Sequence, residues 1–171
     1  MKRILSIVAI CSITALSAAT VQAQSADATA DVTATVMSLL NIEVNQDVVI
    51  GQVMPGTTIF MDSNDEDEYP DGQLGRFEVT GIADADVEYS YNANVTMEGP
   101  GSAQMNFETN AHATHSEALM HGQTTLNATG TVFALSSTGK TFVFIGGTLV
   151  VDENQEAGDY TGQVTLTAEY H

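Results

Sequence analysis

The sequence predicts an all-β protein, an antiparallel β-sandwich of the immunoglobulin-like type. Three observations support this prediction. Apolar and polar residues alternate with a period of two in several segments, as in strands with one buried face. Clusters of Gly, Pro, Asn and Ser separate the segments at intervals of about ten residues. No window shows a helical period.

Residues 1–23 have the composition of a secretory signal peptide. Lys2 and Arg3 precede an apolar stretch, and the small-residue site Val21-Gln22-Ala23 follows it. We therefore expect cleavage before Gln24 and a secreted protein that reaches the cell surface or an extracellular filament through the periplasm. An N-terminal extension, residues 24–37, then precedes a sandwich domain, residues 38–171.

Cys11 is the only cysteine and lies inside the signal peptide. Lipid attachment is not expected there, because Ile10 stands where a lipoprotein needs a small residue. The mature chain would then contain no disulfide, so its stability must come from a hydrophobic core.

The strand candidates follow one another along the whole mature chain. The first is residues 28–36, in which Ala28, Ala30, Val32, Ala34 and Val36 are the apolar positions. The alternation resumes at residues 39–44, and from Tyr160 it continues to Tyr170. Between them the expected strands are residues 58–61, 76–82, 87–94, 104–108, 131–135, 141–145 and 148–151, with the pair Gly146-Gly147 taken as a break.

The composition is strongly acidic, with 22 acidic and four basic residues and a formal net charge of −18. After the signal peptide, Arg76 and Lys140 are the only basic residues. This excludes nucleic-acid binding, because that affinity comes from neutralising phosphates, and it disfavours anionic membrane surfaces. No apolar run beyond the signal is long enough to span a bilayer.

The stretch "MDSNDEDEYPDG" offers hard oxygen ligands of the kind that calcium takes. The candidate ligands are Asp62, Asp65, Asp67 and Asp71. The EF-hand register fails, since Asp67 stands at the glycine position and Gln73 at the position of the bidentate glutamate. We therefore favour a solvated hairpin tip over a specific calcium site. Calcium is the one cofactor that the sequence suggests.

The segment "NAHATHSEALMHG" holds three histidines, His112, His115 and His121, with Glu117 nearby. Imidazoles bind transition metals when a helix or paired strands fix their geometry, whereas this segment is predicted to be a loop. No nucleophile elbow or comparable catalytic motif occurs, so we do not expect an enzyme.

Three blocks carry a resemblance to known proteins: "VVIGQVMPG", "GRFEVTG" and "IGGTLVVDENQEAGDYTGQVTLTAEY". They resemble the recurring blocks of a family of secreted bacterial proteins known only as a domain of unknown function, over residues 34–170. The last block is the most specific. Its matching residues are Gly146, Gly147, Leu149, Gly158, Tyr160, Gly162 and Tyr170.

The same ending is similar to that of chaperone–usher pilus subunits, including the archaic and spore coat U-like branches. Gly158 and Tyr170 stand at the places of that family's glycine and penultimate tyrosine. The resemblance implies a pilin-like sandwich that is completed by a strand from a periplasmic chaperone and then, after passage through an outer-membrane usher, from the next subunit.

Two functions remain open on the sequence. The first is a subunit of a pilus, fimbria or matrix filament that assembles with itself by donor-strand exchange. Residues 28–36 are the candidate donor, because an added strand places alternate side chains into a groove. They could cover the chain's own open edge or a neighbour's. The second is a monomeric secreted sandwich that binds calcium or a surface glycan.

Overall fold

The structure, a computed structural model, describes residues 28–34, 36, 39–65, 72–118 and 123–171. The chain divides into two units, residues 1–35 and residues 36–171. Within the described residues there are strands and no helix, which confirms the all-β prediction. The strands are β1 (Asn41–Gln46), β2 (Thr58–Met61), β3 (Gly75–Thr80), β4 (Asp86–Tyr91), β5 (Asn94–Glu98), β6 (Gln104–Thr114), β7 (Thr124–Leu126), β8 (Thr131–Ala134), β9 (Lys140–Val150) and β10 (Leu166–Tyr170).

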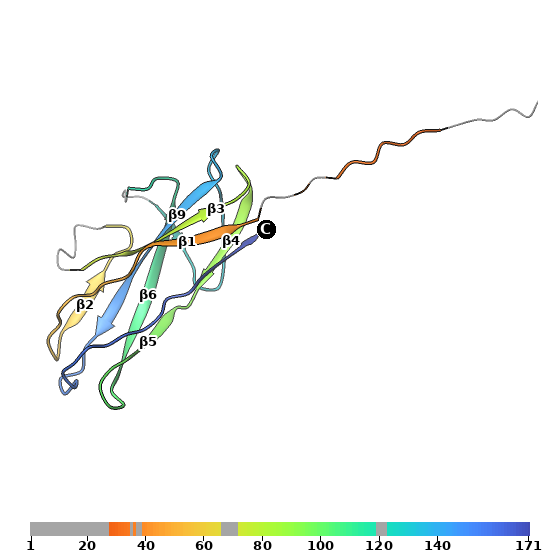
Figure 1. Cartoon of the computed structure of the whole chain (residues 1–171). Coiled ribbons are helices and arrows are strands. Elements are labelled where there is room, and N and C mark those ends of the chain that lie inside the picture. The colour runs from red at the N-terminus through yellow and green to blue at the C-terminus, as the bar shows by residue number, and fades with distance from the viewer. Residues whose placement is uncertain (1–27, 35, 37–38, 66–71, 119–122) are drawn as a thin grey trace, which may run out of the picture. The chain divides into compact units, whose positions relative to one another are not determined.

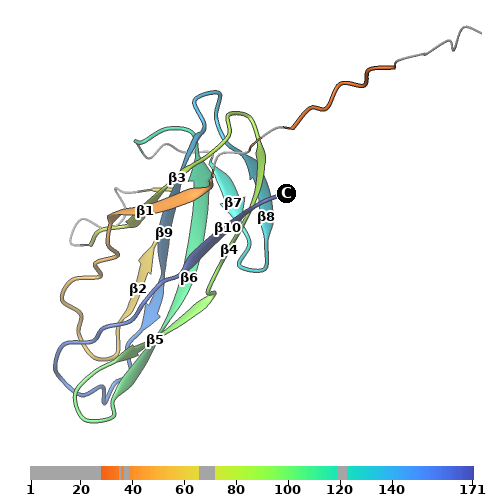
Figure 2. The ribbon, with the colours of Figure 1, turned by 45° about the vertical axis from the view of Figure 1, so that its right-hand side comes forward.

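The strands of the second unit form two antiparallel sheets (Figures 1 and 2). The larger sheet has the order β1-β3-β9-β6-β5, with β2 also paired to β9 and β7 to β6. The smaller sheet has the order β10-β4-β8, which Figure 2 shows in front of β6 and β7. Apolar side chains from both sheets pack together between them, among them Val79, Val87, Tyr89, Val143 and Leu166. The domain is therefore a β-sandwich.

The alternation in the sequence explains which face of each strand is buried. In β6 the residues Met105, Phe107, Thr109 and Ala111 are buried while their neighbours up to Glu108 are exposed. The end of the chain behaves in the same way. Leu166 is buried and Tyr170 is partly buried, whereas the intervening Thr167 and Glu169 are exposed.

Strand β9 departs from alternation because both of its faces are covered. Val143 and Ile145 point into the core between the sheets, whereas Phe142 and Phe144 pack on the other face in a cluster with Met61 and Leu74. A near-continuous apolar run is the expected pattern for a strand that is buried on both sides.

The break predicted at Gly146-Gly147 is wrong, because both glycines lie inside β9. Neither has a positive φ, and both are paired with β6, so the strand continues through them. A Cβ on Gly146 would overlap the carbonyl oxygen of Met61, and one on Gly147 would overlap that of Glu108. The two glycines let neighbouring backbone approach closely.

Other strand predictions differ in extent. Residues 58–61 match β2. The strand predicted at residues 87–94 corresponds to β4 and the first residue of β5. Strand β6 runs six residues beyond its predicted end at Glu108. The sequence did not predict most of β5 or any of β7. Both strands are short, and both pair with β6. The residues of a short segment do not by themselves reveal that it will pair with a distant strand.

Candidate functional site: a groove between two strand edges

One edge of the sandwich continues beyond β1. Strand β1 pairs with β3, with an irregularity between Val44 and Gln46, and the chain then makes a further bridge between Val49 and Gln73. The two backbone hydrogen bonds of this bridge measure 2.8 and 2.7 Å. Because successive residues of a strand direct their backbone groups to opposite sides, those of Val48 and Ile50 point away from β3. Among the described residues, no strand pairs with that outer side.

A second edge is formed by the segment that leads into β10. Thr161 bridges Glu98 through two backbone hydrogen bonds of 2.8 and 2.9 Å, and β10 then pairs with β4. The backbone groups of Tyr160 and Gly162 consequently point away from β5. In the described part of the chain, this outer side also lacks a paired strand.

The two edges flank an apolar groove with a volume of about 410 Å³. Its floor consists of side chains from β5, β6 and β9 of the larger sheet, and its walls are apolar residues of the two edges. Figure 1 shows the dark blue chain that leads to the C-terminus in front of β6 and β9, and the orange chain that follows β1 beside β2. The floor is Val95, Met97, Met105, Phe107 and Leu149, and the walls include Val48, Ile50, Val53, Tyr160 and Val164.

The groove therefore opens onto residues that belong to the hydrophobic core. Phe107 is 3% exposed and Leu149 is 1% exposed, so the cluster beneath the groove is well packed. Val44 also lies along the first edge and is 60% exposed, although its alternation partner Ile42 packs against the core. An unpaired edge with apolar side chains beside it is a template for an additional strand.

Gly158 and Tyr160 fix one end of the second edge. The Tyr160 hydroxyl donates a 2.7 Å hydrogen bond to the carbonyl oxygen of Glu156 and accepts one of 2.7 Å from Nε2 of Gln155. Gly158 has a φ of 154°, and a Cβ there would lie 2.9 Å from Cγ of Pro100. A larger residue at position 158 would push this edge away from the turn that follows β5.

Tyr170 fixes the other end. Its hydroxyl accepts a 2.9 Å hydrogen bond from the backbone N–H of Ile82, and a Cβ on Gly81 would lie 2.5 Å from that hydroxyl. Gly158 and Tyr170 thus lie at opposite ends of the segment that forms the second edge. The groove lies beside the part of the segment nearer to Gly158.

The proposed donor residues lie outside any strand in the single chain. Residues 28–34 and 36 have no strand assignment, and all of them are exposed. Val32 is 95% exposed and Val36 is 94% exposed. The apolar side of the expected strand at residues 28–36 is therefore uncovered.

The predicted calcium ligands are only partly described. Asp62 and Asp65 belong to one turn, in which the backbone N–H of Asp65 donates a 3.0 Å hydrogen bond to the carbonyl oxygen of Asp62. Oδ1 of Asp62 accepts one of 2.9 Å from the backbone N–H of Asn64. Asp67 and Asp71 lie outside the described residues. No three acidic or histidine side chains gather into a metal-binding group within the described part.

The histidines occupy separate places. Nδ1 of His112 lies 2.5 Å from Oγ of Ser63, and its Nε2 lies 3.0 Å from Oγ1 of Thr125. Burial lowers the pKa of His112. Ser63 is fully buried, and His112 is partly buried.

His115 instead has its Nε2 2.8 Å from the carbonyl oxygen of Ala134, and its ring lies against Phe133. His121 is not among the described residues. Glu117 forms an ion pair of 3.7 Å with Arg76.

A comparison with protein families matches residues 68–170 to the family described as a domain of unknown function (DUF4402). The chain belongs to this family. The DUF4402 region includes the blocks "GRFEVTG" and "IGGTLVVDENQEAGDYTGQVTLTAEY", which confirms the resemblance to a domain of unknown function, whereas "VVIGQVMPG" precedes the match. No curated protein matches the chain.

The DUF4402 match covers only part of the groove. It includes the whole floor and the edge at residues 158–170, whereas the edge that continues from β1 lies before it. The sequence pointed to Gly158 and Tyr170 as assembly residues, a role that stays a prediction. It did not point to the floor residues Met97, Met105 and Phe107. Alternation shows that such residues are buried, and only the fold shows that they lie beneath an open edge. No helix in the described part has the length and apolarity to cross a membrane.

Proposed function

We propose that this protein is a structural subunit of an extracellular filament, a pilus, fimbria or matrix fibre, in which a strand from another subunit fills the groove. The observation that carries the proposal is the apolar groove of about 410 Å³ between two edges, neither of which has a partner on the facing side among the residues that the structure describes. A strand placed there would pair with both edges and cover the half-buried apolar side chains of the walls, which combines backbone hydrogen bonds with apolar burial.

The N-terminal extension has the properties of such a strand. Its apolar positions alternate and carry alanine or valine, so one face presents small side chains to the groove. The seven residues 158–164 span about 23 Å as an extended strand, and the nine residues 28–36 span about 30 Å. The extension is long enough to cover the groove in a single pass.

Chain length supports a donor from a second copy. A strand that runs antiparallel to β10 in the groove would run parallel to β1, with Val36 near the Ile50 end. Residues 41–50 span about 30 Å, whereas the residues between Val36 and Asn41 extend over only about 17 Å. The same chain could reach its own groove only as a hairpin with β1, which places the extension parallel to β10.

Export through the periplasm would supply the conditions for such assembly. A subunit with an open apolar groove is prone to aggregate, so a periplasmic chaperone that lends a strand and an outer-membrane usher are the partners that we propose. Filament formation outside the cell would then exchange the chaperone strand for that of the next subunit.

The test compares two substitutions of equal charge in the donor segment. Val32→Asp would place an unpaired charge in an apolar groove and should abolish assembly. Thr33→Asp adds the same charge on the opposite side of the strand and should leave assembly intact at about 0.5 M NaCl, where exposed charges are screened. Size-exclusion chromatography after dilution measures the polymer length. Polymers of Val32→Asp, or a wild type that stays monomeric at every concentration, would contradict the proposal.

A monomeric wild type would leave the binding function, for calcium or a glycan, as the alternative. A hairpin within one chain would also give a monomer. The two kinds of monomer differ in their response to Val32→Asp. This substitution would lower the unfolding free energy of the hairpin monomer and would leave that of a simple binding protein unchanged.

A further inference from the structure

We propose that repulsion between like charges controls the filling of this groove, so that assembly is slow at low ionic strength and is promoted by salt. This inference rests on the proposed function and on the donor being residues 28–36 of a second copy. It concerns the polar side of the donor strand, which faces solvent when the apolar side faces the groove.

The polar side of the donor carries an acidic residue at its centre. Asp31 lies between Ala30 and Val32 and is exposed, and the remaining polar positions within the segment are the threonines 29, 33 and 35. Because Asp31 is central, it lies near the middle of the groove whichever way the donor runs. No basic residue occurs in the segment to offset it.

Acidic residues also lie along both edges of the groove. Asp159 lines the groove and is exposed, and Asp47 is exposed on the edge that continues from β1. Further along the two edges, Glu43 and Glu169 are also exposed. A donor strand laid between the edges brings Asp31 between acidic residues on both sides.

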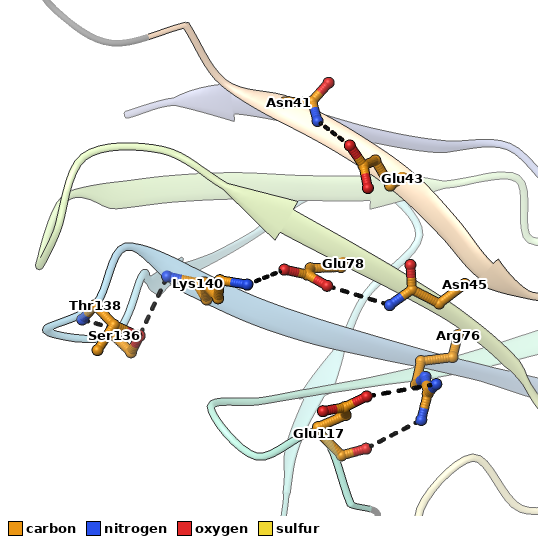
Figure 3. Close-up of polar contacts among 9 residues, drawn as sticks. All are labelled: Asn41, Glu43, Asn45, Arg76, Glu78, Glu117, Ser136, Thr138 and Lys140. Carbon is orange, nitrogen blue, oxygen red and sulfur yellow. Dashed lines mark hydrogen bonds and ion pairs between the residues drawn. The ribbon is translucent and has the colours of Figure 1, made fainter.

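The basic side chains of the described part pair with other acidic residues, although Lys140 also attracts Glu43. Both lie in ion pairs on the outer face of the sheet, Arg76 with Glu117 and Lys140 with Glu78 (Figure 3). Lys140 lies 2.5 Å from Oε1 of Glu78, whose Oε2 accepts a further hydrogen bond of 3.2 Å from Asn45. The pKa of Glu78 is held below its usual value chiefly by the hydrogen bond from Lys140, so both partners stay charged and paired.

Charge on the whole molecule acts in the same direction. The formal net charge of the chain is −18, so two copies repel one another as they approach. Screening lengths fall from about 30 Å at 0.01 M salt to about 3 Å at 1 M, which spans the distances between the groove and the donor during docking. Most charge-complementary complexes form more slowly in salt, whereas this one should form faster.

The experiment follows polymer formation by the full mature chain with light scattering at NaCl concentrations between about 20 and 500 mM. Wild type should assemble about tenfold faster at the higher concentration. Asp31→Asn and Asp159→Asn should each assemble faster than wild type at low salt and should depend less on salt. The matched control is Asp84→Asn, which removes an equal charge from a turn before β4 where asparagine tolerates the φ of 58°.

The outcomes separate this inference from the proposed function. If Val32→Asp blocks assembly but the wild-type rate is independent of salt, only the inference fails. If Asp84→Asn changes the salt dependence as much as Asp31→Asn, net charge rather than the groove is responsible and the inference also fails. If no polymer forms at any salt concentration, the proposed function fails. A few millimolar CaCl₂ could instead raise the rate of polymer formation far more than NaCl does at equal ionic strength. That result would contradict charge screening and indicate a bound calcium ion.

Discussion

Replacement of Gly146 by alanine should destabilise the sandwich, although alanine is ordinarily the better residue inside a strand. Gly146 lies in β9, where a Cβ would overlap the carbonyl oxygen of Met61 and lie 3.0 Å from Cδ2 of Leu74. Met61 is 1% exposed and packs in the cluster with Phe142 and Phe144, so this backbone has little freedom to move aside.

The size of the effect follows from two opposing contributions. Overpacking of a core costs about 1–3 kcal/mol, and the upper part of that range applies because the obstacle is backbone. Alanine regains about 0.5–1 kcal/mol through the lower entropy of the unfolded chain. The net loss of unfolding free energy is therefore about 2 kcal/mol, which lowers the melting temperature by about 4–8 °C for a domain of this size.

Urea denaturation followed by circular dichroism measures this loss. With a slope of about 2 kcal/mol/M, the midpoint should fall by about 1 M. Both proteins should carry Val32→Asp, so that assembly does not contribute to stability. Val150→Ala is the control in the same strand, because its side chain is 64% exposed and its loss should change stability by less than about 0.5 kcal/mol. A Gly146→Ala protein as stable as its parent would refute the close approach of β2 to β9.

Three further predictions concern other parts of the chain. Tyr170→Phe should lower the unfolding free energy by about 1 kcal/mol through loss of the hydrogen bond from Ile82, and Tyr170→Ser should cost more because the ring is lost as well; urea midpoints measure both. Burial lowers the pKa of His112 in the folded protein, so as pH falls the unfolded chain takes up a proton before the folded protein does. The unfolding free energy should therefore decline as pH falls from about 6.5 to the lowered pKa of the folded state. Chemical denaturation between pH 7.5 and 5 should show a smaller decline for His112→Gln, and equal declines would refute this role. Intact mass of the secreted protein should correspond to a chain that begins at Gln24 without lipid, whereas a diacylglycerol adduct on Cys11 would contradict the signal-peptide prediction.

Local pattern was sufficient for several strands. Residues 58–61 were predicted at their observed bounds, and the alternation from Val164 to Tyr170 correctly separated the inward from the outward residues, whereas Gly162 is exposed. These results depend on a period of two, which each segment carries in its own residues. The break predicted at the glycine pair in β9 was wrong, because glycine occurs both in turns and where two backbones approach closely. Local sequence does not distinguish these two uses.

The sequence by itself determined the all-β class and the faces of most strands. Only the tertiary structure decided that a groove exists. Its two edges, residues 41–53 and 158–170, come from opposite ends of the domain, and its floor comes from β5, β6 and β9. An open edge is a strand without a neighbour on one side, and pairing is set by the packing of the whole sandwich rather than by the residues of either edge.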